Sequence, residues 1–316
     1  MPEKTTTRWR GALALQDVIV IGYALVLAVL WWARAPAPGP GPAIRQVYAC
    51  LALVPAAAFV AREVPEVPWG ARINVYRVVV VGAIVWGYLI LRDALPVIRT
   101  DTVDASLAAA DARIFGGEPV LWLEALNRRP VVEWMSFFYF NYYTLLLAHV
   151  VGALWIARSP RVAAEFGVGT ALIFCAGHLG YMAVPAYGPV SFFADRFRAP
   201  LDGGLFWGLV SGSVEAGGAM KDVFPSMHTG ATAWLALFAV RQATLDRRWR
   251  VPAALTCFCA ANIALSTLVL RWHYVVDVLA GLTLASLTLW ASVRLARWEE
   301  ARRSRLGLGP VWPRRR

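Results

Sequence analysis

The chain has 316 residues, of which 59% are hydrophobic and 16% are charged, and its mean hydropathy is +0.53. Soluble globular domains carry about 25% charged residues, so this composition favours an integral membrane protein over a soluble domain. The formal net charge of +11 does not indicate a nucleic-acid partner, because the arginines fall in short breaks between long apolar runs and in the C-terminal tail.

Eight apolar runs are long enough to cross a membrane, since a spanning helix needs about 20 mostly apolar residues. The sequence therefore predicts an all-α integral membrane fold with about eight transmembrane helices. The first run exceeds the apolar core of a signal peptide, so we interpret it as a membrane anchor. The predicted spans are residues 14–33, 46–62, 73–92, 131–157, 163–185, 226–241, 251–270 and 273–295.

Basic residues in the connecting segments predict the orientation of these spans, because cytoplasmic segments carry an excess of Lys and Arg. With a cytoplasmic N-terminus, the basic segments fall on the cytoplasmic side and the nearly charge-balanced stretches 93–130 and 186–225 fall outside. An even number of spans then places both termini in the cytoplasm. The basic positions are Lys4, Arg8, Arg10, Arg62, Arg72, Arg158, Arg161, the segment 241–250 and the tail from Arg294.

The stretch between the third and fourth spans contains two short segments with helical periodicity. Residues 101–114 and 119–127 begin or continue with acidic residues and fit helices that lie along the membrane surface. We expect one membrane domain with four regions along the chain. These are N-terminal transmembrane helices at 1–92, extracytoplasmic interfacial helices at 93–130, a catalytic transmembrane core at 131–296 and a basic cytoplasmic tail at 297–316.

The fourth span contains the aromatic run FFYFNYY at 137–143. This run could line a groove that admits a lipid, but aromatic belts at membrane interfaces are common, and we favour the belt. His178 lies in the outer third of the fifth span and could reach a site on that side.

The motif FPSMHTG at 224–230 marks the start of the sixth span. Proline suits the first turn of a helix, and the free N–H groups that follow make an anion site. Ser226 adds a hydroxyl donor, and His228 lies about one turn inside the helix. The alternative is that Pro225 and Ser226 only start a helix, which His228 anchors at the interface.

The motif RWHYVVDVLAG at 271–281 marks the start of the eighth span. His273 and Asp277 are four residues apart, so they share one helix face. The carboxylate can accept the proton of one imidazole nitrogen and leave the other free as a nucleophile, while Arg271 can turn toward a phosphate. The alternative is a cluster that only settles the helix among the headgroups, yet ionisable residues grouped at a span are usually functional.

The predicted topology brings both motifs to one side of the membrane. Two imidazoles, with Arg271 and Lys221 as cations, suit in-line phosphoryl transfer, in which one histidine attacks phosphorus and the other protonates the leaving oxygen. Together, PSMH and HYVVD resemble the type-2 phosphatidic acid phosphatase superfamily, with a Pro-Ser-x-His motif and a His-x-x-x-Asp motif. The resemblance implies that His228 is the acid/base, His273 the nucleophile and Asp277 its orienting partner.

The chain departs from the phosphatase branch of that superfamily, since it contains no Lys-x6-Arg-Pro motif before residue 224 and has Ser266 and Thr267 where that branch has Ser-Arg. Arg271 lies just ahead of HYVVD, and the stretch GYMAVPAYGP occupies 180–189. In these two features the chain is more similar to the inositol-phosphorylceramide synthase branch. Candidates for holding the phosphate are Ser226, Arg271 and Lys221, with Arg196 and Arg198 as further cations.

The resemblance implies an inositolphosphotransferase-like enzyme that moves a phosphorylated headgroup from a phospholipid donor to a lipid alcohol through a phosphohistidine. With water as the acceptor, the same site would be a lipid phosphate phosphatase. A transporter or an inactive scaffold is the alternative from another class. Nothing in the sequence has metal-site spacing, so we expect neither a metal nor another cofactor.

Overall fold

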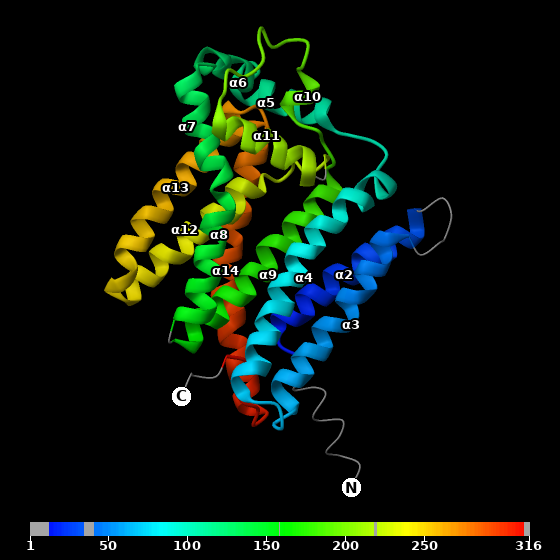
Figure 1. Cartoon of the computed structure of the whole chain (residues 1–316), viewed down its shortest axis with the longest axis vertical. Helices are drawn as coiled ribbons and strands as arrows, with labels where there is room; N and C mark the ends of the chain where they lie inside the picture. Colours follow the sequence, from blue (N-terminus) through cyan, green and yellow to red (C-terminus); the bar gives the residue numbers. More distant parts are fainter. Residues whose placement is uncertain (1–12, 35–40, 158, 218–219, 313–316) are drawn as a thin grey trace. The chain divides into compact units, whose positions relative to one another are not determined.

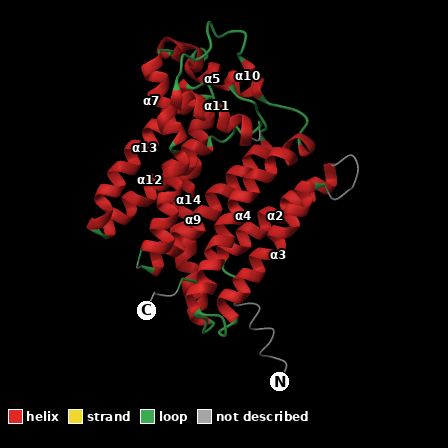
Figure 2. Ribbon diagram, in the orientation of Figure 1, coloured by secondary structure: helices red, strands yellow, loops and turns green. Residues whose placement is uncertain are grey.

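The computed structural model describes residues 13–34, 41–157, 159–217 and 220–312, and within these ranges the backbone forms helices joined by loops (Figure 2). In this described part of the chain, the β-type pairing is one isolated bridge between Ala186 and Asp222. The all-α prediction is confirmed. Several basic positions used to predict the orientation lie outside the described residues: Lys4, Arg8, Arg10, Arg158, Arg314, Arg315 and Arg316.

Among the described residues, seven helical segments are long and apolar enough to cross a membrane, and each corresponds to a predicted span. This supports an integral, multi-pass membrane protein. The segments are α2 (Leu15–Arg34), α3 (Pro42–Glu63), α4 (Trp69–Ile98), the run Arg129–Ile156, α9 (Pro160–Ala183), the run Arg247–Val269 and α14 (Val275–Arg305).

The predicted sixth span corresponds to α12 (Met227–Leu245), which is not one of those seven. Eleven of its nineteen residues are buried, including Thr229, Thr232 and Gln242. A helix surrounded by other helices does not need the apolar surface that lipid demands of an outer helix. Its polar content therefore follows from its buried position.

The chain forms two compact units, each assembled from segments that are distant in sequence. One consists of Met1–Ile98, Ala153–Cys175 and Trp290–Arg316, and the other of Arg99–Gly152 and Ala176–Leu289. All residues of the two sequence motifs belong to the second unit.

The first unit contains α2, α3 and α4, which pack against one another (Figure 1). A buried polar contact joins the three helices. The carboxylate of Asp17, fully buried, accepts hydrogen bonds from Nη1 of Arg62 at 2.9 Å and from the hydroxyl of Tyr76 at 2.6 Å. Because an unpaired buried charge is costly, this pairing fixes how the three helices meet.

The second unit confirms that the stretch after α4 is helical. It contains α5 (Asp104–Phe115), α6 (Pro119–Trp122) and the 3-10 helix η1 (Leu123–Leu126), which match the segments predicted at 101–114 and 119–127. Their placement along the membrane surface stays a prediction. The remaining elements of this unit are α7 (Arg129–Phe140), α8 (Tyr142–Val151), α10 (Pro189–Phe192), α11 (Leu205–Gly217), η3 (Arg247–Trp249) and α13 (Arg250–Val269). The π-helical turn η2 (Gly152–Ile156) follows α8, and its residues after Gly152 belong to the first unit.

Helix α11 lies in a stretch that we did not predict to be helical. The helix contains three glycines, which weaken the helical signal. The first N–H groups of a helix have no partner within it, and here Glu133 of α7 accepts hydrogen bonds from the N–H groups of Gly204, Phe206 and Trp207 at 2.8–3.0 Å. This stabilisation comes from a residue about 70 positions away, so local patterns could not reveal it.

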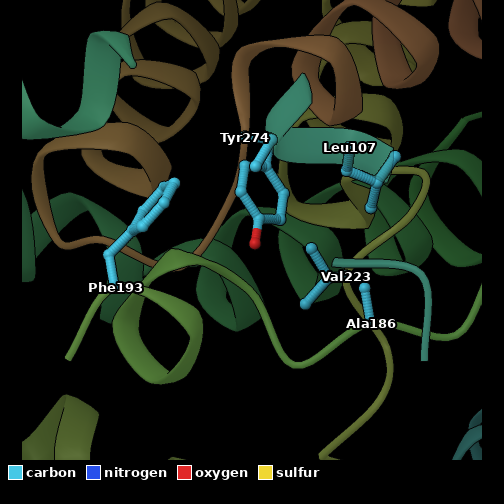
Figure 3. Close-up of a cluster of buried hydrophobic side chains, with 6 residues drawn as sticks. Leu107, Ala186, Phe193, Val223 and Tyr274 are labelled. Atoms are coloured by element: carbon cyan, nitrogen blue, oxygen red, sulfur yellow. The ribbon is translucent and has the colours of Figure 1, made fainter. Parts of the chain in front are cut away.

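A small apolar core surrounds the start of α14 (Figure 3). The ring of Tyr274 lies among Leu107, Ala186, Phe193 and Val223, which come from α5, the loop after α9, the end of α10 and the loop before α12. These side chains bring four separate segments together beside the second motif.

Candidate active site

Helix α12 begins within the first motif. Ser226 is the N-cap of α12, and its hydroxyl oxygen accepts from the N–H of Thr229 at 3.4 Å and donates to the hydroxyl of Thr229 at 3.1 Å. Ser226 is fully buried. The predicted phosphate-binding hydroxyl is thus already engaged in capping the helix, and Pro225 precedes the cap rather than lying in the first helical turn.

The two motifs meet through their backbones. The N–H of Ser226 donates to the carbonyl oxygen of Asp277 at 3.0 Å. A Cβ atom added to Gly281 would lie 2.5 Å from the carbonyl oxygen of Ser226 and 3.1 Å from the nitrogen of Gly230. Glycine at 281 therefore allows α12 and α14 to approach each other beside Ser226 and Gly230, within one turn of His228.

The second motif starts α14 after a tight turn. Arg271 has φ +67°, and the N–H groups of Trp272 and His273 both donate to the carbonyl oxygen of Thr267. Oδ2 of Asp277 accepts from the N–H of Tyr274 at 2.7 Å and lies 3.5 Å from Nδ1 of His273. His273 and Asp277 lie side by side as expected, but within the described residues Nδ1 of His273 has no hydrogen-bond partner, so the hydrogen bond to the carboxylate stays a prediction. Nε2 of the imidazole lies on the side away from the carboxylate.

The two histidine rings lie near each other, with 6.3 Å between their centroids. His273 and Asp277 are buried, whereas His228 is half-buried. The ring of His228 stacks on Tyr139 at 4.1 Å and also contacts Tyr142 at 4.4 Å. These contacts hold the imidazole of His228 close to the ring of His273.

The tyrosines that hold His228 belong to the aromatic run at 137–143, for which we favoured a membrane belt. The run is divided between two environments. Tyr139 and Tyr142 are buried against His228, while Phe137 and Tyr143 are exposed. Tyr139 and Tyr142 thus belong to the candidate site while their neighbours do not, because a helix turns successive side chains to different faces.

Arg271 lies beside the histidines in sequence, but its guanidinium is held by other groups. Nη1 donates to the carbonyl oxygen of Ala199 at 2.9 Å, Nη2 lies 3.4 Å from Oε1 of Glu124, and the group stacks on Phe197 at 3.9 Å. Burial lowers the pKa of Arg271, and the nearby carboxylate of Glu124 opposes this. Turning toward a phosphate would require Arg271 to exchange these partners.

The other predicted cations have different partners. The ammonium group of Lys221 is buried and donates to the carbonyl oxygens of Arg99, Thr100 and Asp101, just beyond the end of α4. Arg196 pairs with Glu118 at 3.1 Å. Among the described residues, the partners of Lys221 and Arg196 do not include either histidine. Their phosphate-binding roles stay predictions.

Two acidic residues of α5 support the second motif and were missed by our sequence analysis. Asp111 accepts from the N–H groups of Val275 and Val276 at 2.8 and 2.9 Å. Asp104 accepts from the hydroxyl of Tyr274 at 3.1 Å and from the N–H groups of Tyr187 and Gly188, which lie in the loop before α10. Both carboxylates are buried. The available signal was their spacing of seven residues, which places them on one face of a surface helix.

Burial shifts the pKa of both Asp111 in α5 and Tyr274 just before α14. Burial raises the pKa of Asp111, and the N–H groups of Val275 and Val276 oppose that shift. Burial and the neighbouring Asp104 raise the pKa of Tyr274, so its hydroxyl keeps its proton and donates to Asp104. The acceptor role of Asp111 rests on its two hydrogen bonds from the start of α14.

No group of three or more His, Cys, Asp or Glu residues is placed to hold a metal ion in the described part of the chain. The chemistry available to the candidate site is that of two imidazoles and a carboxylate. Independence from metals and other cofactors stays a prediction.

A sequence profile for the PAP2 superfamily matches residues 105–291, which is more than half of the chain and includes His228, His273 and Asp277. The chain belongs to the PAP2 superfamily. Neither a curated protein nor a solved structure matches it significantly. The match confirms the resemblance to the type-2 phosphatidic acid phosphatases at the level of the superfamily.

Membership of the PAP2 superfamily, with the membrane-spanning helices, makes the chain a membrane enzyme that acts on lipid phosphate esters as a phosphatase or a phosphotransferase. The matched region begins inside α5 and ends within α14. It thus includes Asp111 and the aromatic residues that hold His228, as well as both motifs.

Proposed function

We propose that the protein is a lipid phosphotransferase of the inositol-phosphorylceramide synthase type, which moves a phosphorylated headgroup from a phospholipid to a lipid alcohol. The observation that carries the proposal is the convergence of His228 and His273, with 6.3 Å between ring centroids and Asp277 beside His273. Nucleophile, orienting carboxylate and acid/base are the groups that a double displacement at phosphorus requires.

In the proposed reaction, Nε2 of His273 attacks phosphorus and the bond from phosphorus to the diacylglycerol oxygen breaks. Asp277 accepts the Nδ1 proton in a hydrogen bond and stabilises the positive ring. His228 gives its proton to the leaving oxygen. The acceptor alcohol then loses its proton to His228 and attacks phosphorus, which returns His273 to its starting state.

The partners that three of the predicted cations have within the described residues support a phosphodiester donor. Lys221 is bound to three carbonyl oxygens, Arg196 is paired with Glu118, and Arg271 is shared between Glu124 and Ala199. A phosphodiester carries one negative charge, whereas a monoester carries about 1.5 to 2 at neutral pH. A site with Arg271 as its nearby cation suits the smaller charge, which favours transfer of a headgroup over hydrolysis of a phosphomonoester.

The partners implied by this proposal are a phospholipid donor, a lipid alcohol acceptor and the bilayer. We also propose that the site opens to the extracytoplasmic face and that both termini are cytoplasmic, because the segment 241–250, at the opposite end of α12 from His228, is basic. Donor and acceptor would then meet in the outer leaflet.

The test uses purified protein in mixed micelles with a phospholipid labelled in its headgroup phosphate, with and without a long-chain lipid alcohol. We expect labelled headgroup phosphate to appear on the alcohol and to depend on its presence. Release of labelled inorganic phosphate from a phosphomonoester, unaffected by alcohol, would replace the proposal with the lipid phosphate phosphatase. Absence of turnover with every phosphate ester would leave the transporter or scaffold.

A further inference from the structure

The N-terminus of α14 is held by two carboxylates from different parts of the chain. Asp277, in the first turn of α14, accepts from the N–H of Tyr274. Asp111, from α5, accepts from the next two N–H groups, those of Val275 and Val276, one on each carboxylate oxygen. Three successive N–H groups that lack partners within a helix are thus divided between two acids.

This division matters because Asp277 has a second contact. The same oxygen, Oδ2, that accepts from Tyr274 lies 3.5 Å from Nδ1 of His273. Within the described residues, neither Nδ1 of His273 nor Oδ1 of Asp277 has a hydrogen-bond partner, so the two groups are adjacent and a small rotation of the carboxylate would join them. An acid in the first turn of a helix readily binds back to the free N–H groups at the helix start. The carboxylate of Asp277 is therefore available to whichever donor near it is unsatisfied.

We propose that Asp111 is a positioning residue for the reaction: by binding the N–H groups of Val275 and Val276, it keeps the carboxylate of Asp277 on His273. Without Asp111, these two N–H groups lose their acceptor, and Asp277, which follows them directly in α14, has a carboxylate that can replace it. Turning Asp277 toward them removes the acceptor that fixes the Nδ1 proton of His273. The inference rests on the proposed role of His273 as the nucleophile.

Asp104 anchors the other end of this contact. Asp104 accepts hydrogen bonds from the hydroxyl of Tyr274 and from the N–H groups of Tyr187 and Gly188. These hydrogen bonds connect α5 to the residue after His273 and to the loop before α10. Leu107 and Ala108, on the turns between the two acids, pack in the same apolar core as Tyr274. Helix α5 is therefore fixed beside α14 by contacts that do not depend on Asp111.

The first test follows the tautomer of His273 by NMR of protein labelled with 15N-histidine, with the signal assigned through His273→Ala. We expect the wild type to hold the proton on Nδ1 and Asp111→Ala to give a mixture of tautomers. Leu107→Ala, which loosens the same helix without touching the N–H groups of α14, is the matched control and should keep the wild-type tautomer. An unchanged tautomer in folded Asp111→Ala would overturn the inference.

The second test is kinetic. We expect Asp111→Ala to lower kcat about 10²-fold, as misplaced catalytic groups do, and to leave KM within about twofold, because substrate binding is untouched. In an Asp277→Asn background, Asp111→Ala should cause no further loss, since it acts through Asp277. Losses that multiply would show an independent, structural role and overturn the inference.

Asp111→Asn keeps one acceptor oxygen and should give the same changes at smaller size, which covers the case in which Asp111→Ala fails to fold. The NMR readout needs no substrate. Failure of this inference would therefore appear as an unchanged tautomer, whereas failure of the proposed function would appear as normal turnover by His273→Ala.

Discussion

Replacing Gly281 with alanine tests whether the close approach of α12 and α14 positions the two histidines. The added Cβ would lie 2.5 Å from the carbonyl oxygen of Ser226 and 3.1 Å from the nitrogen of Gly230. Both neighbours are backbone atoms in the first turn of α12, so neither can swing aside as a flexible side chain would. The helices themselves must move apart.

The size of the movement follows from the contact distance. Nonbonded heavy atoms prefer separations of about 3.5 Å, so relieving the 2.5 Å contact requires a displacement of about 1 Å. A misplacement of this size costs about 10²-fold in rate, or roughly 2.7 kcal/mol in the activation barrier. Overpacking should also lower the free energy of unfolding by about 1–3 kcal/mol.

The assay is headgroup transfer by the purified variant, with thermal unfolding in the same detergent. Gly208→Ala is the matched control, because a Cβ added at Gly208 meets no atom within 4 Å. We expect the control to keep wild-type kcat and Gly281→Ala to lose most of it while remaining folded. Wild-type kcat in Gly281→Ala would refute the claim that this approach sets the geometry of the histidines.

Three further predictions concern the chemistry and the topology. His228→Ala and His273→Ala should each abolish turnover in protein that elutes and melts like the wild type, and substantial activity in either would remove that residue from the mechanism. Turnover should survive EDTA and be inhibited by vanadate, which mimics pentacoordinate phosphorus; complete loss on chelation, restored by Mg²⁺, would assign the reaction to a metal. In a background without the native cysteines, Glu215→Cys should react with an impermeant thiol reagent in intact cells and Arg248→Cys should not; the reverse pattern would place the site in the cytoplasm.

The membrane spans could be predicted because long apolar runs are a direct consequence of burying a helix in lipid. Helix α12 was placed correctly although it is less apolar than the seven other segments, since the motif at its start marked the boundary. Helix α11 was missed, because its first N–H groups are satisfied by Glu133, which is remote in sequence. Only the folded chain brings such a cap into place.

The two motifs could be predicted because each places a histidine and its helix start within a few residues. The residues that hold these histidines and their helix starts in place could not be predicted. Tyr139 and Tyr142 reach His228 from α7 and α8, and Asp111 reaches α14 from α5, each through tertiary contacts more than 80 residues apart in sequence. A single sequence reports the spacing of residues within one element, but it does not report which elements face one another.

The central claim is that His273 becomes covalently bound to phosphorus during turnover. The most direct measurement is rapid acid-free quenching of the purified protein mixed with a phospholipid labelled in its phosphate, followed by separation of protein-bound label. We expect an adduct that is stable to base and labile to acid, forms before product, and is absent from His273→Ala. Product formation without such an adduct, or an equal adduct in His273→Ala, would contradict it.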